Sequence, residues 1–87
     1  MKYDIKEVSY RLKATRESLD LTVEDMAKAT KISVEEYIAY ENGDKDISLS
    51  ILDECAEALG IEMIELLTGN SPTLHKYSLV RKGEVFP

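Results

Sequence analysis

The sequence predicts a compact all-α domain of five short helices, followed by a short extended C-terminal tail. Apolar residues recur at helical spacing in successive short segments of the chain. Most of these segments open on a residue that commonly caps helices, or close near a glycine or an asparagine. The chain has 87 residues, 44% of them hydrophobic, which is enough for one small core but not for two domains.

Residues 5–18 are expected to form the first helix. Asp4, followed three residues later by Glu7, is typical of a capping box, which satisfies free backbone N–H groups at a helix start. Apolar residues then return on one face, and this stripe consists of Ile5, Val8, Leu12 and Leu19. The stripe predicts that this helix packs against a core.

Residues 22–29 are expected to form a short second helix. Thr22, with Asp25 three residues later, repeats the start signal of the first helix. Its apolar residues are Val23, Met26 and Ala27. Ala27 lies in the middle of this helix, where only a small side chain would let a neighbouring helix approach closely.

Residues 33–42 are expected to form the third helix. Ser33, with Glu36 three residues later, is again a start signal, and Asn42-Gly43 is a typical helix end. The residues that give this helix an inward face are Tyr37 and Tyr40. Its first turn carries two adjacent carboxylates, Glu35 and Glu36.

Two further helices are expected over residues 49–59 and 62–67. Ser48 can cap the first of them, and Gly60 stops it. The second precedes Thr68-Gly69. The apolar residues expected to face the core from these two helices are Leu49, Leu52, Ala56, Leu59, Leu66 and Leu67.

A domain boundary is expected near residues 68–72, where the composition changes. Residues 1–70 carry 8 Lys/Arg and 16 Asp/Glu, whereas residues 71–87 carry 3 Lys/Arg and 1 Asp/Glu. The second segment is rich in β-branched and aromatic residues, which predicts one or two extended strands with no sheet to join. Because lone strands are not stable, this tail is expected to be disordered, paired with a second chain, or the opening of a longer protein.

The three segments between residues 8 and 69 together resemble one protein family. They are "VSYRLKATRESLDL" (8–21), "LTVEDMAKATKISVEEYIAYENG" (21–43) and "SLSILDECAEALGIEMIELLTG" (48–69). The chain resembles the lambda-repressor-like, Xre-type helix-turn-helix regulators of bacteria and phages over residues 5–69, in register and without gaps. The resemblance implies a five-helix domain and a transcription regulator that binds double-stranded DNA. It also implies that Arg16 and Glu41 form a partly buried ion pair between the first and third helices.

The resemblance further implies that the third helix lies in the major groove of DNA. The residues it places at or near DNA are Thr22, Val23, Lys31, Ser33, Val34, Glu35, Glu36, Ile38, Ala39, Asn42 and Lys45. Glu35 could accept a hydrogen bond from cytosine N4, and Val34 could touch a thymine methyl group. The pair Glu35-Glu36 is otherwise a solvated helix start that the helix dipole favours.

The sequence departs from the family pattern in four respects. Val23 replaces a glutamine, and Ala39 offers no polar group to a base. Lys31 stands where the family usually has glycine, at a position that often needs a left-handed backbone, at a cost of about 1 kcal/mol. The loop after the third helix carries Asp44 and Asp46 near the expected phosphate positions, where the family loop is often basic.

The formal net charge of −6 argues against broad electrostatic attraction to nucleic acid. Around the expected groove face, Lys31 and Lys45 oppose four carboxylates. Weak, salt-sensitive DNA binding by an isolated protomer is therefore expected, with Arg11, Lys13 and Lys28 as candidates for further phosphate contacts. The acidic surface also supports an alternative function, a protein-interaction or dimerisation module that keeps the fold without binding DNA.

The tail carries a second, shorter resemblance. "PTLHKYSLVRKGE" (72–84) looks like the opening strands of a cupin sensor domain, which follows the DNA-binding domain in many proteins of this type. This resemblance implies a longer regulator, a homodimer in its full-length form, that responds to a small-molecule effector through the sensor domain. Dimerisation would raise the affinity for DNA through effective concentration.

Catalytic and membrane functions find little support in the sequence. The chain shows no nucleophile–base pair, no metal-ligand cluster and no phosphate-binding glycine loop, so neither an enzyme nor a cofactor is predicted. His75 lacks a second ligand at metal spacing, and Cys55 is expected to be a small core residue. A single cysteine and the absence of a long apolar run predict a cytoplasmic protein without a membrane span.

Overall fold

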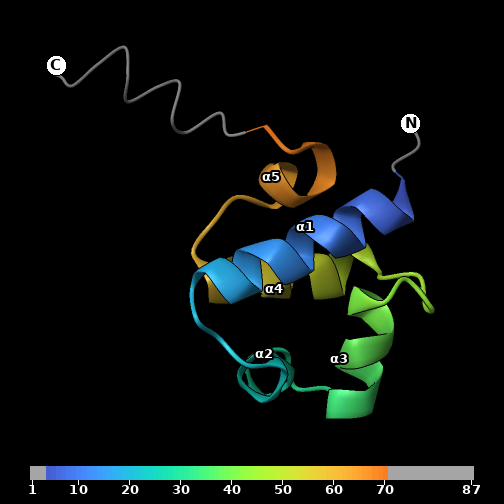
Figure 1. Ribbon diagram of the computed structural model, residues 1–87, viewed down its shortest axis with the longest axis vertical. Coiled ribbons are helices and arrows are strands. Elements are labelled where there is room, and N and C mark those ends of the chain that lie inside the picture. The colour runs from blue at the N-terminus through green and yellow to red at the C-terminus, as the bar shows by residue number, and fades with distance from the viewer. Residues whose placement is uncertain (1–3, 71–87) are drawn as a thin grey trace, which may run out of the picture.

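Five helices follow one another between Asp4 and Asn70 in the computed structural model, which describes residues 4–70 (Figure 1). They are α1 (Ile5–Ser18), α2 (Val23–Thr30), α3 (Val34–Glu41), α4 (Leu49–Leu59) and α5 (Met63–Thr68). The predicted all-α fold is confirmed over this range, whereas the expected extended tail lies outside it. Among these five helices, none is long and apolar enough to cross a membrane.

The helices form two groups around a central pair. In Figure 1, α1 runs across α4, with α5 on one side of this pair and α2 and α3 on the other. Accordingly α1 packs against α3, α4 and α5, while α4 also contacts α2. The second and third helices therefore form one end of the molecule, away from α5.

The helix starts follow from local capping chemistry. Thr22 Oγ1 accepts from the backbone N–H of Asp25 at 3.0 Å, and the Asp25 carboxylate accepts from the Thr22 N–H at 2.9 Å, which completes the predicted capping box. Ser33 and Ser48 cap α3 and α4 through their hydroxyl groups in the same position. Asp4 also caps α1, although its side chain accepts from the Lys6 N–H and forms no reciprocal box.

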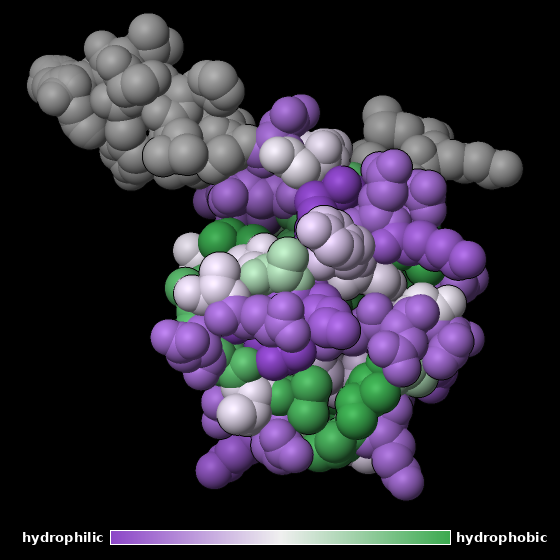
Figure 2. All heavy atoms as spheres, viewed as in Figure 1, coloured by the Kyte–Doolittle hydropathy of each residue, from purple (hydrophilic) through white to green (hydrophobic). Residues whose placement is uncertain are grey.

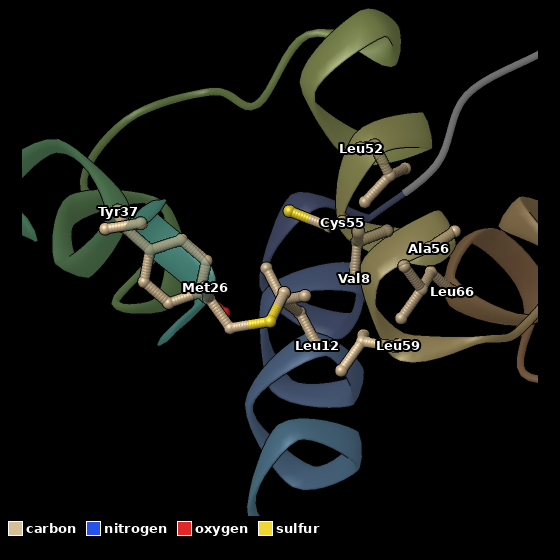
Figure 3. Close-up of a cluster of buried hydrophobic side chains, with 10 residues drawn as sticks. Val8, Leu12, Met26, Tyr37, Leu52, Cys55, Ala56, Leu59 and Leu66 are labelled. Atoms are coloured by element: carbon tan, nitrogen blue, oxygen red, sulfur yellow. The ribbon is translucent and has the colours of Figure 1, made fainter. Parts of the chain in front are cut away.

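The core combines side chains from all five helices. Its fully buried members are shown in Figure 3, where Met26 lies between the Tyr37 ring and Leu12. Burying one such side chain stabilises a protein by roughly 1.5–3 kcal/mol. The buried hydrophobic cluster consists of Val8, Leu12, Met26, Ala27, Tyr37, Leu52, Cys55, Ala56, Leu59 and Leu66.

Two leucines assigned to core stripes are instead exposed. Leu19 is 48% exposed because α1 ends at Ser18, and Leu19 follows as the C-cap residue. Leu49, the first residue of α4, is 62% exposed. Leu67, expected in the core with Leu66, is only half-buried at its edge.

Candidate nucleic-acid interface

The turn between α2 and α3 is built around a left-handed lysine. Lys31 has φ 61° and ψ 38°, which confirms the left-handed backbone expected at this position. Its own N–H donates to the Lys28 carbonyl, and the N–H of Ile32 donates to the Ala27 carbonyl at 3.1 Å. These bonds close α2 and redirect the chain into α3, but a residue with a Cβ is strained there.

Two small side chains of α2 are buried. Ala27 is 3% exposed and Thr30 is 2% exposed. The Thr30 hydroxyl donates to the Met26 carbonyl at 2.7 Å, so its polar atom is satisfied within α2. The helix packs against both α3 and α4.

A buried charged network connects α3 to α1. Arg16 donates from Nε to Glu41 Oε2 at 2.6 Å and from Nη2 to Glu41 Oε1 at 3.2 Å. Its third nitrogen, Nη1, donates to the Leu21 carbonyl at 2.6 Å. Both side chains are almost fully buried, and the hydrogen bond to Glu41 raises the pKa of Arg16. The pair thus holds the end of α3 against the last turn of α1.

Two further polar contacts lie beside this ion pair, one within α3 and one between α1 and α3. The Tyr37 hydroxyl donates to the same Glu41 carboxylate, and burial together with this bond raises the pKa of Tyr37 far above its usual value. Ser9 on α1 donates to the Tyr40 carbonyl at 2.7 Å in a buried position. The sequence interpretation assigned Tyr37 and Tyr40 to packing alone, although Tyr37 and Glu41 are spaced four residues apart, as helical neighbours are.

All eleven residues that the resemblance places at DNA are accessible to solvent in the structure. They come from the start of α2, the turn, α3 and the loop that follows it, which lie at the same end of the molecule. The exposed ones are Thr22, Lys31, Ser33, Glu35, Ile38, Asn42 and Lys45, and the half-buried ones are Val23, Val34, Glu36 and Ala39. The hydroxyls of Thr22 and Ser33 already accept from helix N–H groups.

The two adjacent carboxylates of α3 differ in their surroundings. Glu36 Oε2 accepts from the Tyr40 hydroxyl at 2.8 Å and from Lys45 Nζ at 3.1 Å, and these two bonds lower the pKa of Glu36. Lys45 also lies 5.4 Å from the centre of the Tyr40 ring. Glu35 is exposed and contacts no charged partner among residues 4–70. We call Glu36, Tyr40 and Lys45 the α3–loop cluster.

Arg11, considered as a phosphate contact, instead binds the end of α5. It donates from Nε to the Leu66 carbonyl and from Nη2 to the Leu67 carbonyl, both at 2.7 Å. Its Nη1 also lies 3.7 Å from the Glu7 carboxylate. Because α5 and α3 lie on opposite sides of α1 and α4, this guanidinium cannot join the candidate interface, and that expectation is wrong.

The candidate interface is acidic as a whole. Lys45 is paired with Glu36, so Lys31 is its one cation without an ion pair in the part of the chain that the structure describes. Glu35, Asp44 and Asp46 are exposed around it. A phosphate approaching this surface would meet more carboxylates than free cations.

Cys55 and the acidic residues show no arrangement typical of catalysis. Burial raises the pKa of the Cys55 thiol to about 12, so the reactive thiolate is scarce at neutral pH. Over residues 4–70, no group of three or more His, Cys, Asp or Glu side chains is placed to hold a metal ion. His75 lies outside these residues.

Comparison with known proteins places this geometry among helix-turn-helix proteins. The sequence model of the helix-turn-helix family matches residues 12–66, more than half of the chain and the whole of α2, α3 and α4. No curated protein sequence matches the chain.

Solved structures with the same fold include two bacterial proteins. The restriction-modification controller protein C.AhdI from Aeromonas hydrophila superposes with a TM-score of 0.69 at 28% identity, over 72% of this chain and 96% of that one. The clp gene regulator ClgR from Corynebacterium glutamicum gives a TM-score of 0.69 at 24% identity, over 71% of this chain and 66% of that one. A second ClgR structure from the same organism also gives a TM-score of 0.69 at 24% identity, over 76% of this chain and 87% of that one. The ClgR comparisons support the fold alone.

Proposed function

Since the chain belongs to the helix-turn-helix family, we propose that it is a DNA-binding transcription regulator whose α3 lies in the major groove of DNA. The observation that carries this proposal is the position of α3. It lies at one end of the molecule, held rigidly by the buried Arg16–Glu41 pair while its opposite face remains open to solvent. The likeness to the controller protein C.AhdI, at 28% identity, supports the same function.

The exposed residues of the interface have distinct tasks in this proposal. Lys31 and the start of α2 lie beside the phosphates, where they set the register of the protein. Glu35, Ile38 and Ala39 face the base edges from α3. With few free cations at the interface, the isolated chain binds DNA weakly and loses affinity as salt rises.

The organisation proposed for the whole chain follows the change in composition. Residues 1–70 form the DNA-binding domain, and residues 71–87, which lie outside the described range, begin a cupin sensor domain. A sensor domain of this kind would dimerise the regulator and bind a small-molecule effector, and it would raise DNA affinity through effective concentration. The cytoplasm is the proposed compartment.

A fluorescence-anisotropy titration against a pool of random duplex DNA tests the proposed function. At about 50 mM salt we expect weak binding, and at about 200 mM salt we expect it to collapse, because binding releases counterions from phosphate. The matched control is the same titration with Lys31→Gln, which removes the unpaired cation and flattens the salt dependence. Absence of binding at both salt concentrations contradicts DNA binding by this chain.

The acidic surface favours a second candidate function, a protein-interaction or dimerisation module. The net charge of −6 and the exposed carboxylates around α3 are the observations behind it. Association with a protein partner that persists between about 50 and 200 mM salt, without DNA binding, would support this function over the first.

A further inference from the structure

The open face of α3 presents two side chains that no described contact occupies. Glu35 is exposed and carries neither a hydrogen bond nor an ion pair to another residue between 4 and 70. Ile38 is 39% exposed although it is apolar. Both side chains are therefore available to a ligand that approaches α3.

Glu35 is distinguished from its neighbour by the α3–loop cluster. The Glu36 carboxylate is already bound by the Tyr40 hydroxyl and by Lys45, at 2.8 and 3.1 Å. Both bonds use Oε2 and hold the Glu36 side chain against Tyr40 and Lys45, whereas the Glu35 side chain has no such contact between residues 4 and 70. Glu35 is thus the carboxylate of this pair that can turn towards a base without leaving another partner.

Glu35 and Ile38 lie on the same face of the helix. Residues three apart have Cβ atoms roughly 5–6 Å from each other. Consecutive base pairs are about 3.4 Å apart along the duplex, so the two side chains reach the same or neighbouring base pairs. The two contacts are therefore made side by side.

The chemistry of these side chains restricts which base edges they fit. In the major groove, a carboxylate pairs with the N4 amino group of cytosine and meets only acceptors, O6 and N7, on guanine. An apolar side chain fits the C5 methyl group of thymine. Figure 2 shows hydrophobic residues among the charged ones on the surface over α2 and α3.

We propose that α3 reads pyrimidines, with the Glu35 carboxylate accepting from cytosine N4 and Ile38 contacting the C5 methyl group of a neighbouring thymine. This inference rests on the proposed function, because it requires α3 in the major groove. It adds the bases that are selected and the residue that detects each one. It also gives Ile38, an exposed apolar residue that the core does not use, a role in specificity.

The methyl contact is tested on the DNA side. The full chain first selects its preferred duplex from a random pool at about 50 mM salt, and each thymine of that duplex is then replaced by deoxyuridine, which removes only the methyl group. At one position we expect affinity to fall about fourfold, the effect of losing one buried methyl group. In the Ile38→Ala variant this fall disappears, because the methyl group no longer has a partner.

Ile64→Ala is the matched control, since Ile64 is also 39% exposed but lies on α5 at the other side of the molecule. This variant keeps the fourfold effect. If no thymine replacement weakens binding, or if the loss persists in Ile38→Ala, the inference is overturned while sequence-selective DNA binding still supports the proposed function. If the chain selects no sequence at all, both the inference and the proposed function are overturned.

The cytosine contact is tested by repeating the selection with Glu35→Gln. We expect one cytosine position to lose its preference and adenine to gain there, because glutamine pairs with adenine N6 and N7. Glu17→Gln, an exposed carboxylate of α1, is the control and keeps the wild-type sequence. An unchanged selected sequence in Glu35→Gln would overturn the role of this carboxylate.

Discussion

Arg16 shows how a single side chain holds α3 in position. Its guanidinium uses three nitrogens, two on Glu41 and one on the Leu21 carbonyl. A buried ion pair is costly to desolvate, so its net contribution to stability is small when both partners are present. Removing only the arginine, in contrast, leaves the buried Glu41 carboxylate without its cation.

Replacing Arg16 with alanine should therefore lower stability strongly. We expect a loss of about 3–5 kcal/mol in the free energy of unfolding, because Glu41 stays buried and unpaired. For a domain of this size, that corresponds to a fall in melting temperature of more than about 10 °C, measured by circular dichroism. Lys13→Ala, an exposed cation on the same helix, is the control and should change little. An unchanged melting temperature in Arg16→Ala would rule out the structural role of the pair.

Lys31 offers the opposite case, a residue whose replacement should stabilise the protein. Its φ of 61° is strained for a side chain with a Cβ, and glycine would relieve that strain. We expect Lys31→Gly to raise the free energy of unfolding by about 1 kcal/mol, measured by urea denaturation. Lys28→Gly, three residues earlier inside α2, should instead lower it by about 1 kcal/mol. If both variants lose stability, strain at Lys31 is not the dominant effect.

At the scale of helices, the sequence predicted what depends on neighbours along the chain. Ser33 and Ser48 predict helix starts, because an N-cap requires only a side-chain hydroxyl and a backbone N–H group three residues later. Gly60 predicts a helix end, because the residue after a helix often has a left-handed backbone that favours glycine. Its φ in the structure is 73°. All five helices are consequently found within about one residue of their expected bounds.

What the sequence did not predict depends on how the helices are placed. Leu49 continues the apolar stripe of α4 and is nevertheless 62% exposed, because periodicity does not reveal which part of a stripe the other helices cover. Arg11 binds carbonyl groups 55 and 56 residues away, and Lys45 reaches Glu36 across a loop. The distribution of charge over the candidate interface could therefore be counted from the sequence, but the pairing of those charges could not.

The α3–loop cluster leads to a prediction about α3. Changing both Glu35 and Glu36 to glutamine removes two negative charges and releases Lys45 from its ion pair. We expect non-specific affinity for duplex DNA to rise by about three- to tenfold at about 50 mM salt, measured by fluorescence anisotropy. The double variant Glu7→Gln with Glu17→Gln removes the same charge from exposed positions of α1 and should have a smaller effect. Equal effects of the two double variants would mean that α3 does not approach DNA.

At the scale of the whole molecule, the five described helices share one core. Among residues 4–70, the buried hydrophobic cluster runs from Val8 to Leu66. The last helix is closed by Gly69, whose backbone is left-handed at φ 80°, and Arg11 satisfies two carbonyl groups at its end. The domain boundary near residue 70 stays a prediction from the change in composition, and it can be tested by truncation.

A chain that ends at residue 70 should therefore melt within about 2 °C of the full chain, because truncation removes none of the buried cluster. The contrasting variant ends at residue 61 and lacks α5, so it loses Leu66 and the partner of Arg11. We expect that chain to melt at least about 10 °C lower, since deleting one large buried side chain alone costs about 2–5 kcal/mol. If the chain ending at residue 70 melts as low as the shorter one, the domain extends beyond this boundary. If it melts with the full chain, its affinity for DNA measures what the five helices contribute by themselves.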